Sequence, residues 1–283
     1  RANECGDFSA NIRYLSDMSE LGGHYDVAII ATNAAVRFSV TNALLSAVSI
    51  KHVIFEKVLF QQPSEYDLMA RLLAEKKVDG VVNCPRRMYQ LYQWVKQEYL
   101  GQTLSSTERV DKHSLVVEGH LWGLAGNSIH FIDLYAYLFN AALMSVHLSD
   151  DCEIINSKRS GYVELVGTII CTFDDGGTLT LVSGSNKAKA NSYSVRLQKG
   201  SEILVIDELT GQVTNSRSEH LAPAMSPPYQ SQLSAAVVAS LLHSQQCALT
   251  DFTESSSLHK PLINILTHYF SRQENFHGVC PIT

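Results

Sequence analysis

An apolar run at residues 26–32, followed by a helical pattern and a second apolar run, most constrains what this chain can fold into. The helical pattern covers residues 34–48, and the second apolar run covers residues 52–57. Strands buried on both faces of a parallel sheet have near-continuous apolar sequences, and helices connect them. The pattern therefore predicts β-α-β units over a parallel sheet.

The same alternation extends to either side of this unit. Apolar and capping patterns predict a short strand at 12–15, a helical turn at 16–21, a helix at 64–77, a strand at 80–83 and a helix at 85–100. We therefore assign residues 1–103 to a first domain built on a parallel sheet.

The pattern changes beyond this point. A predicted helix at 126–140 precedes a β-rich region at 144–213, in which turn signals separate consecutive strands, and two helices follow at 230–244 and 255–270. Consecutive hairpins imply antiparallel pairing. The pattern of residues 104–283 therefore predicts an α+β domain with a large, mostly antiparallel open sheet. The C-terminal segment of this domain could pack back on the first domain.

Charge and composition exclude several classes of protein. The chain has 283 residues and a formal net charge of -6, so it has no cationic excess to attract nucleic acid or anionic lipid. No apolar run approaches the ~20 residues of a membrane span. The six cysteines are scattered and the eleven histidines lack metal-ligand spacing. We expect a cytoplasmic protein with reduced thiols and no metal.

Polar side chains follow two of the predicted buried strands, where open parallel sheets bind their ligands. Thr32 and Asn33 follow the first strand and could cap the next helix, line a ligand site, or do both. Glu56 and Lys57 end the second strand. They could form a simple ion pair, or Lys57 could act as an acid/base group, because burial in a cleft lowers the pKa of an amine.

A third group of polar residues lies on the predicted helix at 126–140. Asn127, His130 and Asp133 are spaced by three residues and therefore lie near one helix face. A lone helical histidine is usually structural. A carboxylate one turn away can, however, orient and charge an imidazole, so His130 and Asp133 are candidate catalytic residues.

These segments together resemble the Gfo/Idh/MocA oxidoreductases. Residues 26–33 are similar to the family pattern D-V-x-I-A-T-P/N, and residues 52–58 to H-V-x-x-E-K-P. Residues 83–101 are similar to N/R-x-R-x-x-P and its following helix, and residues 130–133 match H-x-x-D. The resemblance covers most of residues 25–140, and the order and spacing of the motifs make the combination fairly specific.

The resemblance implies that residues 1–103 are a partial Rossmann-like dinucleotide-binding domain and that residues 104–283 are a substrate-binding and oligomerisation domain. It implies an NAD- or NADP-dependent enzyme that acts on a sugar or nucleotide-sugar, such as a polysaccharide precursor, and forms a homodimer or homotetramer through the C-terminal sheet. It implies that Lys57 is the acid/base residue and that His130 bonds the reacting hydroxyl. The implied catalytic set is Lys57, His130, Asp133 and Asn127; the cofactor set is Ala31, Thr32, Asn33, Arg37, Glu56 and Asn83; the candidate substrate residues are Arg86, Trp122 and Tyr137.

The sequence also departs from the family pattern. Val58 replaces the usual proline, Arg37 stands where histidine is common, and Gly126 stands where many members carry an aspartate four residues before the histidine. Asn127 or Asp133 could compensate. The chain has no G-x-G-x-x-G, and we expect about forty residues of a complete Rossmann domain upstream. The alternative is a non-catalytic sugar- or nucleotide-binding relative, a sensor or scaffold.

Overall fold

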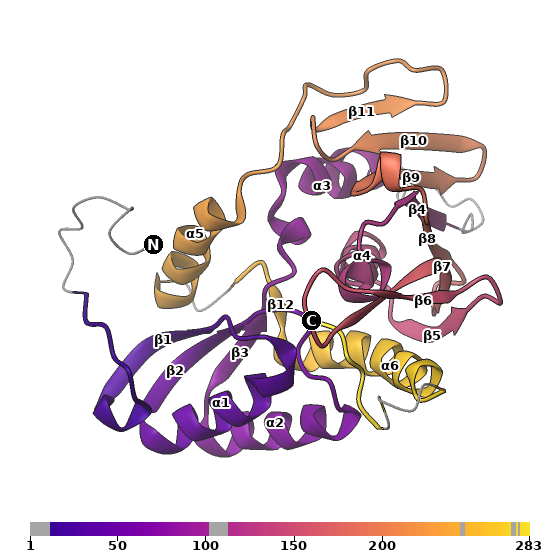
Figure 1. The fold of residues 1–283 in the computed structure, drawn as a ribbon. Helices are drawn as coiled ribbons and strands as arrows, with labels where there is room; N and C mark the ends of the chain where they lie inside the picture. Colours follow the sequence, from indigo (N-terminus) through magenta and orange to yellow (C-terminus); the bar gives the residue numbers. More distant parts are fainter. Residues whose placement is uncertain (1–11, 102–112, 244–246, 273–275, 277) are drawn as a thin grey trace.

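The computed structural model describes residues 12–101, 113–243, 247–272, 276 and 278–283, which build two sheets with helices around them (Figure 1). The first sheet has four strands in the order β1 (His24–Ile30), β2 (Ser49–Phe55), β3 (Asp79–Val82) and β12 (Thr250–Asp251). The first three strands are parallel, and β12 pairs antiparallel with β3. A short C-terminal strand therefore completes a sheet that the N-terminal residues begin.

Helices cover both faces of this sheet. Figure 1 shows α1 (Ala34–Ala47) and α2 (Pro63–Lys76) on one side and α5 (Gln230–His243) on the other. Helix α2 begins at a proline, where no amide hydrogen is needed, and Gln62 and Glu65 form a capping box there. On the opposite face, Val237 and Leu241 of α5 belong to a separate apolar cluster with residues of β2 and β3.

The second sheet has eight strands. Helix α4 (Leu124–Phe139) packs against β7 and β8, and most of its side chains are buried. All neighbouring strands of this sheet are antiparallel except β4 and β8, which run parallel. The order is β11 (Gln212–Asn215), β10 (Glu202–Asp207), β9 (Ser192–Lys199), β4 (His113–His120), β8 (Thr178–Gly184), β7 (Val163–Phe173) and β5 (Leu143–Leu148), with β6 (Glu153–Asn156) also paired to β7.

The C-terminal part of the chain joins the two sheets. Helix α6 (Phe252–Phe270) contacts α2 and β3 on one side and α4 and β5 on the other. The last residues return to the first sheet, where Cys280 donates its amide hydrogen to the Gln61 carbonyl and Thr283 Oγ1 accepts from the Ala34 amide at 3.1 Å. Thr283 thereby caps α1.

The predicted fold class is confirmed, a parallel α/β sheet followed by a mostly antiparallel sheet. Two predicted elements are wrong. Residues 12–15 have no strand partner, and Ile12 and Tyr14 are exposed. The helix predicted at 85–100 is divided at Tyr89, whose backbone is extended, into a 3-10 helix (Pro85–Met88), α3 (Gln90–Trp94) and a π-helical turn (Val95–Leu100).

Two further expectations concern the chain as a whole. The predicted domain boundary at residue 103 lies outside the described residues. Among the helices of the described ranges, none combines the length and apolar character needed to cross a membrane.

Candidate active site

Glu56 and Lys57 follow β2 at the carboxyl edge of the first sheet and line two different cavities. Successive side chains of an extended chain point in opposite directions. Glu56 lines a cavity of about 410 Å³ between this edge and α5, which we call the α5 cavity. Lys57 lines a cavity of about 640 Å³ beside the first turn of α4, which we call the α4 cavity.

Two groups of the first turn of α4 hold the Lys57 ammonium. Its Nζ donates to the Gly126 carbonyl at 3.0 Å and to Asn127 Oδ1 at 2.8 Å. Burial lowers the pKa of Lys57, and the nearby Cys84 and Glu164 oppose that shift. The alternative of a simple ion pair between Glu56 and Lys57 is not among the ion pairs of the described residues, and Glu56 lines the α5 cavity instead. The peptide bond between Lys57 and Val58 is cis.

Glu164, on β7, places a carboxylate at the start of α4. Its Oε2 accepts the Ala125 amide at 2.8 Å, and its Oε1 accepts the Gly126 amide at 3.2 Å. These bonds satisfy amides that a helix N-terminus leaves unpaired, whereas burial, the larger effect, raises the pKa of the carboxyl. A Cβ atom at Gly126 would lie 2.8 Å from Glu164 Oε1. The carboxylate therefore fills the space that glycine leaves open.

Sequence reasoning missed Glu164. We considered Asn127 or Asp133 as compensation for Gly126, yet Asn127 binds Lys57 and the carboxylate beside Gly126 comes from strand β7 of the second sheet. A signal was present in the sequence, because Glu164 is the one charged residue in the eleven-residue strand β7. Glu164 lies far from α4 in the sequence, so no local pattern indicates that it contacts Gly126.

His130 lies one helical turn beyond Asn127 on α4. Its Nδ1 is buried and has no hydrogen-bond partner among the described residues. Burial lowers its pKa well below the usual value, and the positive charges of Arg86 and Lys57 lower it further, so the imidazole is neutral near pH 7. The described residues that line the α4 cavity include Asn127 and Lys57 but not His130.

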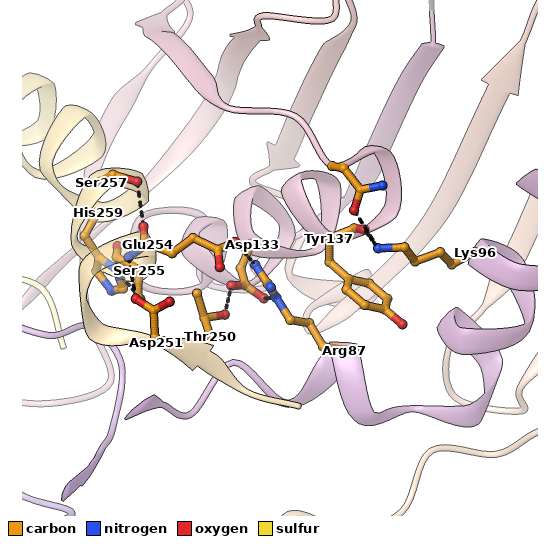
Figure 2. A network of polar contacts seen from close by, with 11 residues as sticks. Arg87, Lys96, Asp133, Tyr137, Thr250, Asp251, Glu254, Ser255, Ser257 and His259 are labelled. Atoms are coloured by element: carbon orange, nitrogen blue, oxygen red, sulfur yellow. Dashed lines mark hydrogen bonds and ion pairs between the residues drawn. The ribbon is translucent and has the colours of Figure 1, made fainter. Parts of the chain in front are cut away.

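Asp133 and Tyr137, further along α4, belong to a different network (Figure 2). Asp133 is buried, accepts from Arg87 Nε at 2.9 Å and is hydrogen-bonded by Thr250 Oγ1. Arg87 also pairs with Glu254 of α6 at 2.7 Å. The Tyr137 ring lies beside the Lys96 ammonium, 4.1 Å from the ring centroid. The network ties α4 to β12 and α6, and neither Asp133 nor Tyr137 lines the α4 cavity.

Three of the residues expected to bind cofactor line the α5 cavity, namely Ala31, Glu56 and Asn83. Glu56 Oε1 accepts from Asn83 Nδ2 at 2.7 Å and from Gln230 Nε2 of α5 at 2.8 Å. Thr32 Oγ1, next to Ala31, is buried without a hydrogen-bond partner among the described residues. These groups present several hydrogen-bonding atoms at one edge of the sheet.

Asn33 occupies the N-cap position of α1, but its side chain makes no capping hydrogen bond. The capping role considered for it therefore falls to Thr283, whose hydroxyl accepts the Ala34 amide.

The two predicted arginines lie in the protein interior. Arg37 is 1% exposed and donates to the carbonyls of Thr32, Val58 and Leu59, so it does not reach the α5 cavity. Arg86 is buried against Glu208, with nitrogen–oxygen distances of 2.7 and 2.9 Å, and is absent from the lining of the α4 cavity. Both side chains therefore bind other protein groups in the interior, and neither lines the α4 or the α5 cavity.

The third predicted substrate residue, Trp122, does line the α4 cavity, and its indole nitrogen donates to the Val182 carbonyl at 2.9 Å. Within the described ranges, no three histidine, cysteine or acidic side chains come together as metal ligands would.

Neither a protein-family model nor a curated protein sequence matches the chain. Solved structures do match over most of its length. The UDP-N-acetylglucosamine 3-dehydrogenase GnnA from Acidithiobacillus ferrooxidans is 13% identical, with a TM-score of 0.65 over 89% of this chain and 81% of that chain. Biliverdin reductase from Synechocystis sp. PCC 6803, in complex with biliverdin and NADP+, is 16% identical, with a TM-score of 0.62 over 85% of this chain and 78% of that chain.

A third match carries a different description. The super-repressor mutant of Gal80p from Saccharomyces cerevisiae is 11% identical, with a TM-score of 0.62 over 88% of this chain and 78% of that chain. The structural neighbours are proteins of the Gfo/Idh/MocA type, and this chain has their fold. The resemblance inferred from the sequence is thereby confirmed for the fold. Fold alone does not fix activity, so function has to be argued from the site.

Proposed function

We propose that this chain is an NAD- or NADP-dependent oxidoreductase that oxidises a hydroxyl of a sugar derivative or reduces the corresponding ketone. The observation that carries the proposal is that the consecutive residues Glu56 and Lys57 line two different cavities. Hydride transfer requires cofactor and substrate to meet closely, with a separate group ready to exchange the hydroxyl proton. In this proposal, Glu56 faces the cofactor in the α5 cavity and Lys57 faces the substrate hydroxyl in the α4 cavity, and both residues follow β2 directly.

The α5 cavity fits the nicotinamide ribose of such a cofactor. Glu56 and Asn83 present hydrogen-bonding groups suited to ribose hydroxyls. The hydroxyl of Thr32, which follows Ala31 in the chain, is buried and has no partner among the described residues. Because the sequence contains no G-x-G-x-x-G turn, we assign these residues to the nicotinamide end and none to the pyrophosphate. When bound, the cofactor supplies the hydride acceptor in one direction and the donor in the other.

Lys57 exchanges the proton. In oxidation its neutral amine accepts the hydroxyl proton, and in reduction its ammonium returns a proton to the oxygen. Burial lowers the pKa of Lys57, so the neutral amine becomes accessible closer to neutral pH. Asn127 and the Gly126 carbonyl fix the position of Nζ, and the Glu164 carboxylate limits the fall in pKa. Glu164 thus takes the place of the acid that Gly126 lacks.

The expected role of His130 at the same oxygen remains a prediction, because His130 does not line the α4 cavity. Its imidazole is neutral and its Nδ1 has no partner in the described chain, so the ring retains hydrogen-bonding capacity. The helical spacing places it one turn from Asn127, which already holds Lys57.

A sugar derivative is the substrate class that the comparisons favour, since GnnA is a UDP-N-acetylglucosamine 3-dehydrogenase of the same fold. We further propose assembly into a homodimer or homotetramer through the large sheet.

The test is a screen of the purified protein with NAD+ and with NADP+ against neutral sugars, sugar phosphates and nucleotide-sugars. The absorbance of reduced nicotinamide reports turnover, and at least one substrate is expected to give it. Glu56→Ala should weaken cofactor binding, whereas Glu75→Ala, at an exposed position of α2, should not. Cofactor or sugar binding without turnover across the panel would contradict the proposal and favour a sensor or scaffold.

A further inference from the structure

The α4 cavity has a cationic wall that the chemistry at Lys57 does not use. Lys158 and Arg159 reach it from the turn after β6, and Lys187 reaches it from the 3-10 helix after β8 (Lys187–Lys189). With Lys57, four cationic side chains line the cavity against one acidic side chain, Glu164. The cavity lining is therefore strongly cationic, although the whole chain has a formal net charge of -6.

These three outer cations have no acidic partner in the described part of the chain. None forms an ion pair there, although exposed cations elsewhere do, such as Arg196 with Glu118. Lys158 Nζ instead donates to Asn191 Oδ1 at 2.8 Å, which links the turn after β6 to the segment before β9. Side chains of one sign in a concave site concentrate the electrostatic potential there and attract a ligand of opposite charge.

The nearby helix N-terminus does not compete for such a ligand. The Ala125 and Gly126 amides of α4 already donate to Glu164, so an anion in the cavity meets the lysine and arginine side chains instead. Arginine and lysine are the usual partners of phosphate oxygens, through charge-assisted hydrogen bonds. A volume of about 640 Å³ also leaves room for more than one sugar ring, since ligand pockets span about 300–1,000 Å³.

We infer that the α4 cavity binds a sugar linked to a diphosphate, with Lys158, Arg159 and Lys187 binding the phosphate oxygens while the sugar hydroxyl reaches Lys57. The inference rests on the proposed function for the identity of the reacting group, but the anion site stands on its own residues. In this arrangement the negative charge of the diphosphate, and not the sugar ring alone, determines which substrate the cavity selects.

The experiment measures binding of UDP and of inorganic pyrophosphate to the full chain by calorimetry at several salt concentrations. Both should bind, and the triple variant Lys158→Gln, Arg159→Gln, Lys187→Gln should lose at least about tenfold in affinity for each and bind with a weaker salt dependence. Lys189→Gln is the matched control, because Lys189 is an exposed cation of the same short helix that does not line the cavity, and it should bind like the unmodified protein.

Failure of either ligand to bind, or an unchanged affinity in the triple variant, would overturn the inference. A diphosphate could also come from the cofactor, so UDP binding is repeated with saturating NADH. Unchanged UDP affinity supports a substrate site, whereas competition would overturn it. Turnover of a neutral sugar by the unmodified protein, without binding of UDP or pyrophosphate, would refute this inference and leave the proposed function standing. UDP binding without turnover on any sugar would support the anion site and refute the proposed function.

Discussion

The Glu164 carboxylate occupies the space beside Gly126, where a Cβ atom would lie 2.8 Å from Glu164 Oε1. The glycine and the acid belong to different structural units, helix α4 and strand β7. Their pairing explains how the chain places a carboxylate near Lys57 without an acidic residue at position 126 of α4. It also makes the two positions interdependent.

Gly126→Ala should displace Glu164 and weaken the start of α4. The carboxylate would lose its hydrogen bonds to the Ala125 and Gly126 amides, which should cost about 1 kcal/mol of unfolding free energy, as for loss of a helix cap. Urea unfolding measures the change. Gly22→Ala is the control and should leave the unfolding free energy unchanged, because nothing lies within 4 Å of its added Cβ. Equal stability of Gly126→Ala and the unmodified protein would show that Glu164 does not depend on glycine.

Glu164→Gln should shift the pH profile of kcat/KM for oxidation to lower pH. Glu164 raises the pKa of Lys57 against the larger, lowering effect of burial, so removing its charge favours the neutral amine. Because the neutral amine is the proton acceptor, the rise of kcat/KM with pH should occur at a lower pH. Glu153→Gln, at an exposed position of the neighbouring strand β6, is the control. A shift to higher pH would contradict the assigned relationship.

Asp133→Asn should act on stability rather than on chemistry. Asp133 is buried and bonded to Arg87 and Thr250, and removing one partner of a buried ion pair costs about 3 kcal/mol. The exposed pair of Asp67 with Lys260 gives the control, since Asp67→Asn should cost less than about 1 kcal/mol. Full stability with lost turnover in Asp133→Asn would instead assign Asp133 to catalysis, as the sequence motif suggested.

The buried His259 should make the protein less stable in acid. Burial lowers its pKa from 6.5 to about 3, so below pH 6.5 the unfolded chain binds a proton that the folded protein does not. Stability then falls by about 1.4 kcal/mol for each pH unit until the pH nears the folded value. His259→Asn cannot titrate and should show a shallower loss between about pH 6 and pH 4 in urea unfolding. His243→Asn, at an exposed position, should retain the steep loss. Parallel curves for His259→Asn and the unmodified protein would refute this account.

Sequence periodicity predicted the elements whose burial is regular. Strand β7 lies within the predicted β-rich region and helix α1 lies at its predicted position, because each buries a continuous face. Strand β4 was missed, although Leu115 and Val117 alternate with less buried residues as in a half-buried strand. The helix after Pro85 was predicted to be continuous, and the extended backbone at Tyr89 divides it.

The site was predictable only where the residues lie close in sequence or at helical spacing. Lys57 and Asn127 were named from motifs, and the structure brings them within 2.8 Å. Lys158, Lys187 and Glu164 belong to turns and strands of the second sheet, and their approach to Lys57 depends on long-range packing. Patterns within one sequence do not predict such long-range contacts, because the whole fold determines the order of the strands and the positions of the loops.

The central claim is that Lys57 exchanges the substrate proton, and single-turnover oxidation by Lys57→Met tests it most directly. Methionine keeps much of the side-chain bulk but cannot exchange a proton. Once a substrate is identified, Lys57→Met should bind cofactor normally and lose at least about a hundredfold in the rate of nicotinamide reduction. Lys51→Met, on the same strand and away from both cavities, should keep the normal rate. An unchanged rate in Lys57→Met would contradict the account.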